Sequence, residues 1–258
     1  MIRIAIANQK GGVGKTTTAI NIATAMAAIG WKTLLIDLDP QGNASTGLGI
    51  SGIARTRTTY DLLVDGATVE ECTVPTSIPH LDVLPSTVDL SGAELELVAE
   101  EDRATRLRDA LANHRGHQIS FIDCPPSLGL LTLNALTAAD TLLVPLQCEF
   151  FALEGLSQLL QTVERVQERF NPALGIVGVA LTMFDRRNRL TDQVAEDVRE
   201  CLGNLVFDSV IPRNVRLSEA PSHGLPALIY DHGCAGSRAY MALARELIGR
   251  LPQERKAA

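Results

Sequence analysis

The sequence has no uninterrupted apolar run of the roughly eighteen residues that a membrane-spanning helix needs. Its five cysteines include no C-x-x-C pair, which argues against a zinc knuckle or a disulfide framework and favours a reducing cytoplasm. The first residues, MIRIAIANQK, begin at once as an alternating strand and leave no space for a secretory signal. Low-complexity tracts, internal repeats and Pro- or Gly-rich linkers are also missing. We therefore expect one globular domain over residues 1–258.

The chain has fewer basic than acidic residues: 23 Lys and Arg against 30 Asp and Glu, which gives a formal net charge of −7. Such a chain repels the phosphate backbone of nucleic acids at long range. Any contact with DNA must come from a local basic patch that acts against this overall field.

Short apolar runs alternate with longer segments of helical period, which is typical of βαβ units. The pattern predicts a single-domain α/β fold with a mostly parallel twisted sheet and helices on both faces. Residues 44–80 are richer in Gly, Ser and Thr and are expected to be an irregular excursion, and about 252–258 a tail. The predicted strands are Arg3–Ala7, Thr33–Asp37, Leu81–Pro85, Ile119–Asp123, Thr141–Pro145, Ile176–Leu181 and Asp208–Ile211. The predicted helices are Lys15–Ile29, Ala104–Asn113, Leu128–Thr137, Leu153–Phe170, Asp192–Leu202 and Ser237–Leu251.

A glycine-rich turn, KGGVGKTTT, lies between the first strand and the first helix. This is the context of a phosphate-binding P-loop, in which backbone N–H groups and the helix N-terminus converge on phosphate oxygens. Lys15 is expected to neutralise the β- and γ-phosphates, Thr16 to bind magnesium and Thr17 to support the α-phosphate. The remaining cradle residues are Gly11, Gly12, Val13 and Gly14, whose glycines are expected where a side chain would block the phosphate or where φ is positive.

The loop departs from the usual G-x-x-x-x-G-K-T pattern, because Gln9 stands where the first glycine belongs and an additional lysine, Lys10, follows it. Two acidic sites follow apolar strands further along the chain. Asp37 and Asp39 lie in LLIDLDPQGN, and Asp123 lies in FIDCPPS. Carboxyl ends of parallel strands form the ligand-binding edge of such sheets, so both sites are expected to face the glycine loop. Read alone, each aspartate is equally a turn former or a helix cap.

The K-G-G-x-G-K-T loop resembles the deviant Walker A motif of the ParA/MinD group of P-loop ATPases. Further segments resemble the small chromosomal ParA/Soj proteins of bacterial DNA segregation: LLIDLDPQGNASTGLGI, IDCPPSLGLLTLNALTAADTLLVPLQCEFFALEGLSQLL, LTMFDRRN and IPRNVRLSEAPSHGLP. The resemblance covers nearly the whole chain. It implies a weak, partner-stimulated ATPase that converts ATP and water to ADP and phosphate with ATP and Mg²⁺ as cofactors.

The resemblance also implies roles for single residues. Lys10 corresponds to a signature lysine that reaches across a two-fold interface to the nucleotide of the partner. The alternative is a solvated surface charge. Asp39 corresponds to the switch aspartate that positions the attacking water, and Asp123 to a Walker B aspartate that holds magnesium through water. Pro212 and Asn214 resemble an adenine-contacting segment, although a simple turn uses the same residues.

The family functions as an ATP-dependent homodimer that binds DNA without sequence preference. A ParB-type centromere-binding protein releases the dimer by stimulating hydrolysis. The resemblance thus implies a cytoplasmic, nucleoid-associated protein with no stable membrane binding. Its DNA-binding arginines correspond best to Arg187 and Arg216, with Arg186 and Arg189 as helpers. A charge cluster is more often a solvated face, and Arg213 is an alternative nucleotide ligand.

Three other functions share the loop. A MinD-like membrane-associated ATPase needs a basic amphipathic helix at the C-terminus. Here the stripe of Tyr240, Leu243, Leu247 and Leu251 is better explained by docking on the domain. A nitrogenase-iron-protein type needs two cluster-ligating cysteines per chain, whereas only Cys124 is suitably placed. Small-molecule kinases and ligases also carry the loop, but the partitioning-type segments argue against them.

Overall fold

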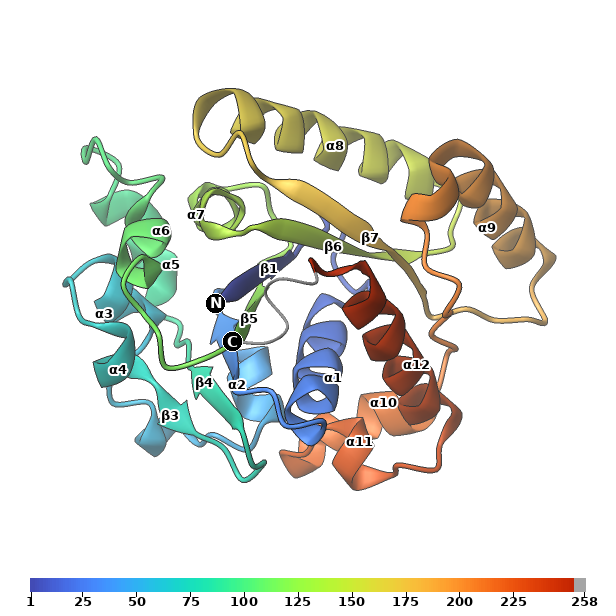
Figure 1. Cartoon of the computed structure of the whole chain (residues 1–258), viewed down its shortest axis with the longest axis horizontal. Helices are drawn as coiled ribbons and strands as arrows, with labels where there is room; N and C mark the ends of the chain where they lie inside the picture. The colour runs from blue at the N-terminus through green and yellow to red at the C-terminus, as the bar shows by residue number, and fades with distance from the viewer. Residues whose placement is uncertain (253–258) are drawn as a thin grey trace.

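The computed structural model of the chain describes residues 1–252 and centres on a twisted sheet (Figure 1). In these residues the sheet has seven strands in the order β3-β4-β2-β5-β1-β6-β7. Only β3 runs antiparallel to its neighbour, so the predicted mostly parallel sheet is confirmed. The strands are β1 (Ile2–Ile6), β2 (Thr33–Asp37), β3 (Val74–Pro75), β4 (Leu81–Leu84), β5 (Ile119–Asp123), β6 (Thr141–Gln147) and β7 (Gly175–Thr182).

Helices cover both faces of the sheet, as predicted (Figure 1). One face carries α1 (Lys15–Ala28), α2 (Asn43–Gly47), α10 (Val215–Glu219), α11 (Ala227–Tyr230) and α12 (Ala235–Arg250). The other face and its ends carry α3 (Thr59–Leu63), α4 (Val69–Cys72), α5 (Leu90–Glu96), α6 (Arg106–Leu111), α7 (Leu130–Ala138), α8 (Ala152–Arg169) and α9 (Arg189–Leu202). Three short 3-10 turns complete the elements: η1 (Gly52–Ala54), η2 (Gly203–Leu205) and η3 (Ala220–His223).

Alternating strand residues supply the two apolar cores. In β1, Ile4 and Ile6 belong to the core under α1, whereas Ala5 belongs to the core on the opposite face. Because successive side chains of a strand point to opposite faces, a strand buried on both sides must be apolar throughout. This requirement explains why the central strands read as short continuous apolar runs.

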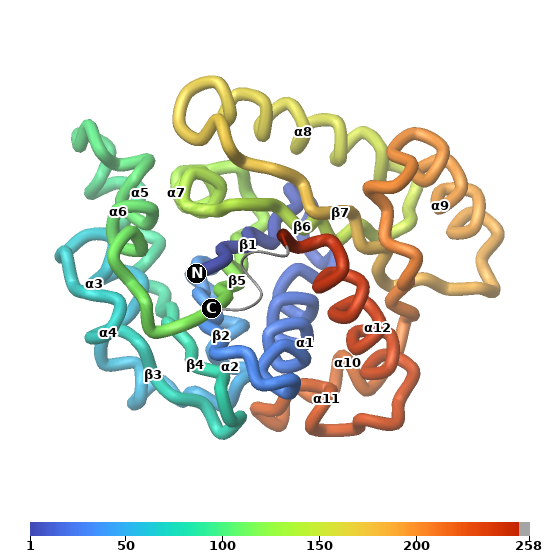
Figure 2. The backbone as a smooth tube through the Cα atoms, in the orientation of Figure 1, coloured from blue at the N-terminus to red at the C-terminus, as the bar shows by residue number. Residues whose placement is uncertain are grey.

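Helices α1 and α12 lie side by side although they come from opposite ends of the chain (Figure 2). The hydroxyls of Thr18 and Tyr240 are 3.1 Å apart in this contact. Tyr240, Leu243 and Leu247 are at most 1% exposed, and Leu251 is also buried. The apolar stripe of α12 thus docks on the domain, as predicted, and is not presented to a membrane. Within residues 1–252, no helix has the length and apolar character needed to cross one.

The predicted strand at Asp208–Ile211 is wrong. In the described chain beyond β7, Val206 forms an isolated bridge with Val179 of β7, Pro212 forms one with Phe184 after β7, and the Ile211 N–H donates to the Leu181 carbonyl at 2.8 Å, but no continuous ladder forms. The amides of Asp208 and Ser209 donate instead to the Glu246 carboxylate, at 2.8 and 3.0 Å. These donors are therefore unavailable to a strand ladder. The other six predicted strands are present, with ends shifted by at most two residues.

Residues 44–80, the segment expected to be an irregular excursion, contain short helices and the edge strand β3. Thr58 and Thr68 begin α3 and α4 with capping boxes that use Asp61 and Glu71. A capping box satisfies two backbone donors at a helix start and stabilises even a single turn. Of the tail predicted at about 252–258, only Pro252 belongs to the described part of the chain. Residues 253–258 lie outside it.

Candidate nucleotide site

The glycine loop connects β1 to α1 at the C-terminal edge of the sheet. Gly12 and Gly14 have φ angles of 74° and 88°, a region that side-chain-bearing residues rarely adopt. The Thr18 N–H donates to the Gly14 carbonyl at 2.9 Å, so the helical ladder begins there. The first N–H groups of a helix have no intrahelical acceptor, and with the helix dipole they form a site for anions.

Gly11 differs from these two glycines. Its φ is not positive, and a Cβ added to it would meet only the Pro126 Cβ, at 3.9 Å. The protein itself therefore tolerates a side chain at this position. The close approach of a phosphate that was predicted for Gly11 stays a prediction.

Two polar residues that the sequence analysis missed hold the loop in place. Asn8 donates to the Pro145 carbonyl at 2.7 Å and accepts from the Lys10 N–H at 3.0 Å. Thr182, at the end of β7, donates to the Val13 carbonyl at 2.7 Å. The bonds of Asn8 to Pro145 and of Thr182 to Val13 each span more than 130 residues of sequence, so no local pattern predicts them.

Lys15 is buried, with 7% of its surface exposed, and its ammonium donates to the Lys10 carbonyl at 2.9 Å. Burial lowers the pKa of Lys15, and the nearby charges of Asp123 and Asp39 oppose this shift. A lysine that burial has partly desolvated gains strongly from an anion placed beside it. The role predicted for Lys15 toward the β- and γ-phosphates stays a prediction.

Lys10 lies at the rim of the loop and forms an ion pair with Glu149, the second residue after β6. Both side chains are more than 40% exposed. Exposed ion pairs of this kind stabilise by about 0–1 kcal/mol, so moving Lys10 to another anion costs little. Lys10 is thus a weakly held cation at the open edge of the site, whereas Lys15 is fixed inside it.

The two strand-end aspartates lie at the carboxyl ends of their strands, as predicted, and the structure places them next to each other. Asp37 and Asp123 are register partners at the ends of β2 and β5, and Ile6 at the end of β1 is the other partner of Asp123. Both carboxylates are fully buried. Neither oxygen of Asp123 has a hydrogen-bond partner among the described residues, although the Thr16 hydroxyl lies near enough to influence its pKa. Burial, and then the charge of Asp37, raise the pKa of Asp123 well above its ordinary value.

Asp37 is satisfied where Asp123 is not. Its Oδ2 accepts from the backbone N–H and the hydroxyl of Ser45 at 2.8 and 2.7 Å, and its Oδ1 accepts from the Asp39 N–H at 3.2 Å. Burial raises the pKa of Asp37 to about 6 against the effect of these hydrogen bonds. Asp39, the second residue after β2, is buried with 8% exposure, and its Oδ1 accepts from the Gln41 N–H at 3.0 Å.

A cavity of about 470 Å³ opens beside the loop, between α1 and the segment that follows the Asp208–Ile211 stretch. Its lining includes Pro212 and Asn214, the two residues expected to contact adenine, and Thr17. It also includes Met183 and Arg213, of which only Arg213 was considered beforehand, as an alternative. Met183 has a φ of 50°, a strained conformation for a residue with a side chain. Asn214 also caps α10, because its side chain accepts from the Arg216 N–H at 2.9 Å.

The arginines expected to bind DNA lie on two neighbouring segments. Arg186, Arg187 and Arg189 follow β7, and Arg216 lies in α10, while the bridge between Phe184 and Pro212 joins the segments. Arg187 is paired with Asp185 at 3.1 Å, and Arg216 with Glu219 at 2.8 Å and Asp231 at 3.5 Å. These carboxylates reduce the positive field of the cluster.

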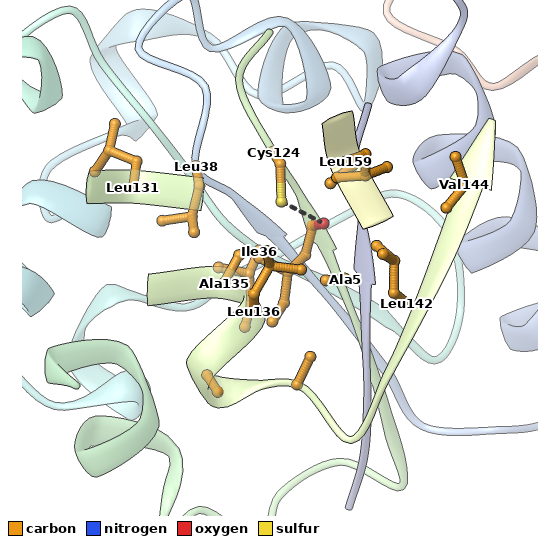
Figure 3. Close-up of a cluster of buried hydrophobic side chains, with 14 of the residues drawn as sticks. Ala5, Ile36, Leu38, Cys124, Leu131, Ala135, Leu136, Leu142, Val144 and Leu159 are labelled. Carbon is orange, nitrogen blue, oxygen red and sulfur yellow. Dashed lines mark hydrogen bonds between the residues drawn. The ribbon is translucent and has the colours of Figure 1, made fainter. Parts of the chain in front are cut away.

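Cys124, which follows Asp123 in the chain, lies in the core among apolar side chains such as Ile36 (Figure 3). Its Sγ is 3.7 Å from the Ile122 carbonyl, and burial raises the pKa of the thiol. A buried, protonated thiol is a poor metal ligand and behaves as a small apolar side chain. Within residues 1–252, no three His, Cys, Asp or Glu side chains are grouped to hold a metal ion by themselves.

A family model described as an AAA domain matches residues 1–176. The chromosome partitioning protein ParA of Caulobacter vibrioides is 61% identical over 250 residues, covering 96% of this chain and 94% of that protein. The sporulation initiation inhibitor protein Soj of Bacillus subtilis is 53% identical, covering 95% and 97%. The structure of cobyrinic acid a,c-diamide synthase from Mycobacterium smegmatis with bound ADP and magnesium has a TM-score of 0.83 at 37% identity, covering 96% and 94%.

The glycine loop, the buried lysine and the facing aspartates at one sheet edge define a P-loop nucleotide hydrolase. The chain belongs to the ParA/Soj family of chromosome-partitioning ATPases, as its identity to ParA and Soj over nearly its whole length shows. The identity to the diamide synthase is lower, which agrees with the choice of a partitioning protein over a small-molecule ligase.

Proposed function

We propose that the chain is an ATP-driven switch in chromosome segregation. ATP closes a sandwich dimer, the dimer binds DNA without sequence preference, and a ParB-type partner releases it by stimulating hydrolysis. The observation that carries this proposal is the contrast between the two lysines of the loop. Lys15 already occupies the cradle, so a second cation held only loosely at the rim by Glu149 is free to serve another molecule.

The residues present fit a magnesium ion. The partnerless, buried carboxylate of Asp123 calls for a cation or a water bound to one, and the Thr16 hydroxyl lies at the start of α1 beside it. We assign Thr16 and Asp123 to this ion, Asp123 through water. When bound, magnesium supplies positive charge to the phosphate oxygens.

The chain's own groups divide the remaining work. The N–H groups of the glycine loop and Lys15 bind the phosphates, and Asp39, just after β2, orients the attacking water. Lys10 of a second copy adds charge that stabilises the transition state only after pairing. Pro212 and Asn214 bind the adenine in the cavity beside Thr17, with Met183 and Arg213 as further contacts.

DNA binding is proposed for Arg187 and Arg216 with Arg186 and Arg189 as helpers, and dimerisation doubles their number. If one copy neutralises about three phosphates, a fourfold rise in salt weakens binding about fortyfold. With about six phosphates the same change costs roughly two-thousandfold, and affinity at low salt rises correspondingly. A cluster partly balanced by Asp185, Glu219 and Asp231 therefore binds DNA strongly only in the dimer.

Light scattering tests this proposal directly. We expect a monomer with ADP, a dimer with ATP or a slowly hydrolysed analogue, and a DNA complex only for the dimer. A protein that remains monomeric with the analogue at all concentrations measured would contradict the proposal.

Replacing Arg216 with glutamate should abolish retention of DNA by the ATP-loaded protein and leave ATP binding intact. The change reverses the charge in the proposed patch and opposes the new carboxylate to Glu219 and Asp231. Gel-shift titrations with non-specific DNA at two salt concentrations measure the effect. Arg165→Glu, the same charge change at an exposed position of α8, is the matched control and should retain DNA. Equal retention by both variants would place the patch elsewhere.

A further inference from the structure

Arg55, just after η1, holds together three segments of the chain close to the turn that carries Asp39. Its guanidinium donates to the Ile50 carbonyl from Nε and Nη2, at 3.2 and 2.9 Å. It also donates to the Ser86 carbonyl at 2.9 Å and to the Thr46 hydroxyl at 2.8 Å. A rigid, planar group with several donors suits such a junction, because each bond fixes the direction of the others.

One chain of hydrogen bonds leads from Arg55 to Asp39. The Thr46 hydroxyl, which accepts from Arg55, donates to the Gly42 carbonyl at 3.0 Å. The Gly42 N–H in turn donates to the Asp39 carbonyl at 2.9 Å. Gly42 has a φ of 61°, and a Cβ there would collide with the guanidinium and lie 2.8 Å from the Ser86 carbonyl. Arg55 therefore packs directly against the turn that carries Asp39.

A second chain reaches the same turn from the other side. Ser86, whose carbonyl accepts from Arg55, donates its N–H to the Ser45 hydroxyl at 3.1 Å. Ser45 donates to the Asp37 carboxylate, and that carboxylate accepts from the Asp39 N–H. The backbone of Asp39 is thus held at its N–H through Asp37 and at its carbonyl through Gly42.

We propose that Arg55 is a positioning residue for ATP hydrolysis, which fixes the turn over residues 39–42 and the start of α2 so that the Asp39 carboxylate faces the phosphate site. This inference rests on the proposed role of Asp39 in orienting water. All acceptors of Arg55 lie in residues 46–86, outside the glycine loop, so ATP binding does not depend on it.

Replacing Arg55 with alanine should lower kcat by roughly tenfold to a hundredfold, the range for a small misplacement of a catalytic group, and leave the KM for ATP unchanged. Arg55→Lys should recover only part of kcat, because an ammonium cannot match three acceptors at fixed angles. Guanidinium ion added at millimolar concentration should restore turnover to the alanine variant. Single-turnover hydrolysis and ATP titration separate these quantities.

Arg57→Ala is the matched control, because Arg57 lies two residues further and pairs with Glu71 at 3.2 Å on the surface. It should leave kcat unchanged. If Arg55→Ala fails to fold, Thr46→Val decides the matter, since it removes the hydroxyl relay while Arg55 stays, and it should lower kcat in the same way. The inference is overturned if Arg55→Ala and Thr46→Val both keep the parental kcat, or if Arg57→Ala loses kcat to the same extent as they do. If Asp39→Ala hydrolyses ATP at the parental rate, the proposed role of Asp39 fails. If Asp39→Ala is slow but Arg55→Ala and Thr46→Val hydrolyse ATP at the parental rate, only the inference about Arg55 fails.

Discussion

The Lys10→Ala variant is expected to bind ATP as tightly as the parent but to hydrolyse it at least about a hundredfold more slowly. A charge supplied by a second subunit in phosphoryl transfer is worth about 10³- to 10⁵-fold in rate, or roughly 4–7 kcal/mol. Lys10 lies outside the cradle in the single chain and contacts Glu149, so its removal spares the groups that first bind ATP. Nucleotide titration and single-turnover hydrolysis measure the two effects separately.

Lys15→Ala provides the contrast, because it removes the buried ammonium within the cradle. It should lose ATP binding and every later step, whereas Lys10→Ala should lose dimerisation and hydrolysis only. Mixing the Lys10→Ala protein with the parent sharpens the test. In a mixed dimer the parental Lys10 serves the variant's site, whereas the parental site faces the alanine, so catalysis moves to the variant's site. Labelled ATP bound to the variant beforehand should therefore be hydrolysed once the parent is added. Parental turnover by Lys10→Ala alone would disprove the role in trans.

The sequence predicted the central strands well because burial on both faces demands continuous apolar runs, a strong local signal. The error at Asp208–Ile211 has a non-local cause. Glu246 in α12 takes the amides that a strand would use, and no residue near Asp208 announces this contact. The short helices of residues 44–80 were missed because a single turn has too few residues to show a period.

The candidate site likewise has features that the sequence predicts and features that only the folded chain shows. The motif predicted positive φ angles within the glycine loop, which Gly12 and Gly14 have, and the strand-end positions of Asp37 and Asp123; their direct pairing depends on the strand order, which only the folded chain shows. Asn8, Thr182 and Glu149 act on the loop through contacts with residues more than 130 positions away. Their residue types are ordinary for turns and strand ends, so only the folded chain shows what they hold.

Replacing Asp39 with alanine is expected to produce an ATP-bound dimer that forms normally and stays on DNA, with hydrolysis reduced at least about a hundredfold. General-base or water-positioning groups contribute about 10²- to 10⁴-fold to the rate of the chemical step. Asp39 is buried just after β2, and its side chain accepts from the Gln41 N–H and not from the glycine loop. The proposed step that releases DNA is hydrolysis, so blocking it should prolong residence. DNA-release kinetics with ATP measure this residence time.

Asp39→Asn separates the carboxylate from the loop that carries it. An asparagine oxygen can still accept from the Gln41 N–H, so the turn keeps the hydrogen bond seen for Asp39 while the negative charge disappears. If the charge orients the water, Asp39→Asn should be as slow as Asp39→Ala and equally long-lived on DNA, and the exposed control Asp65→Ala should behave as the parent. Rapid turnover by Asp39→Asn would mean that the turn, and not the carboxylate, is what hydrolysis requires.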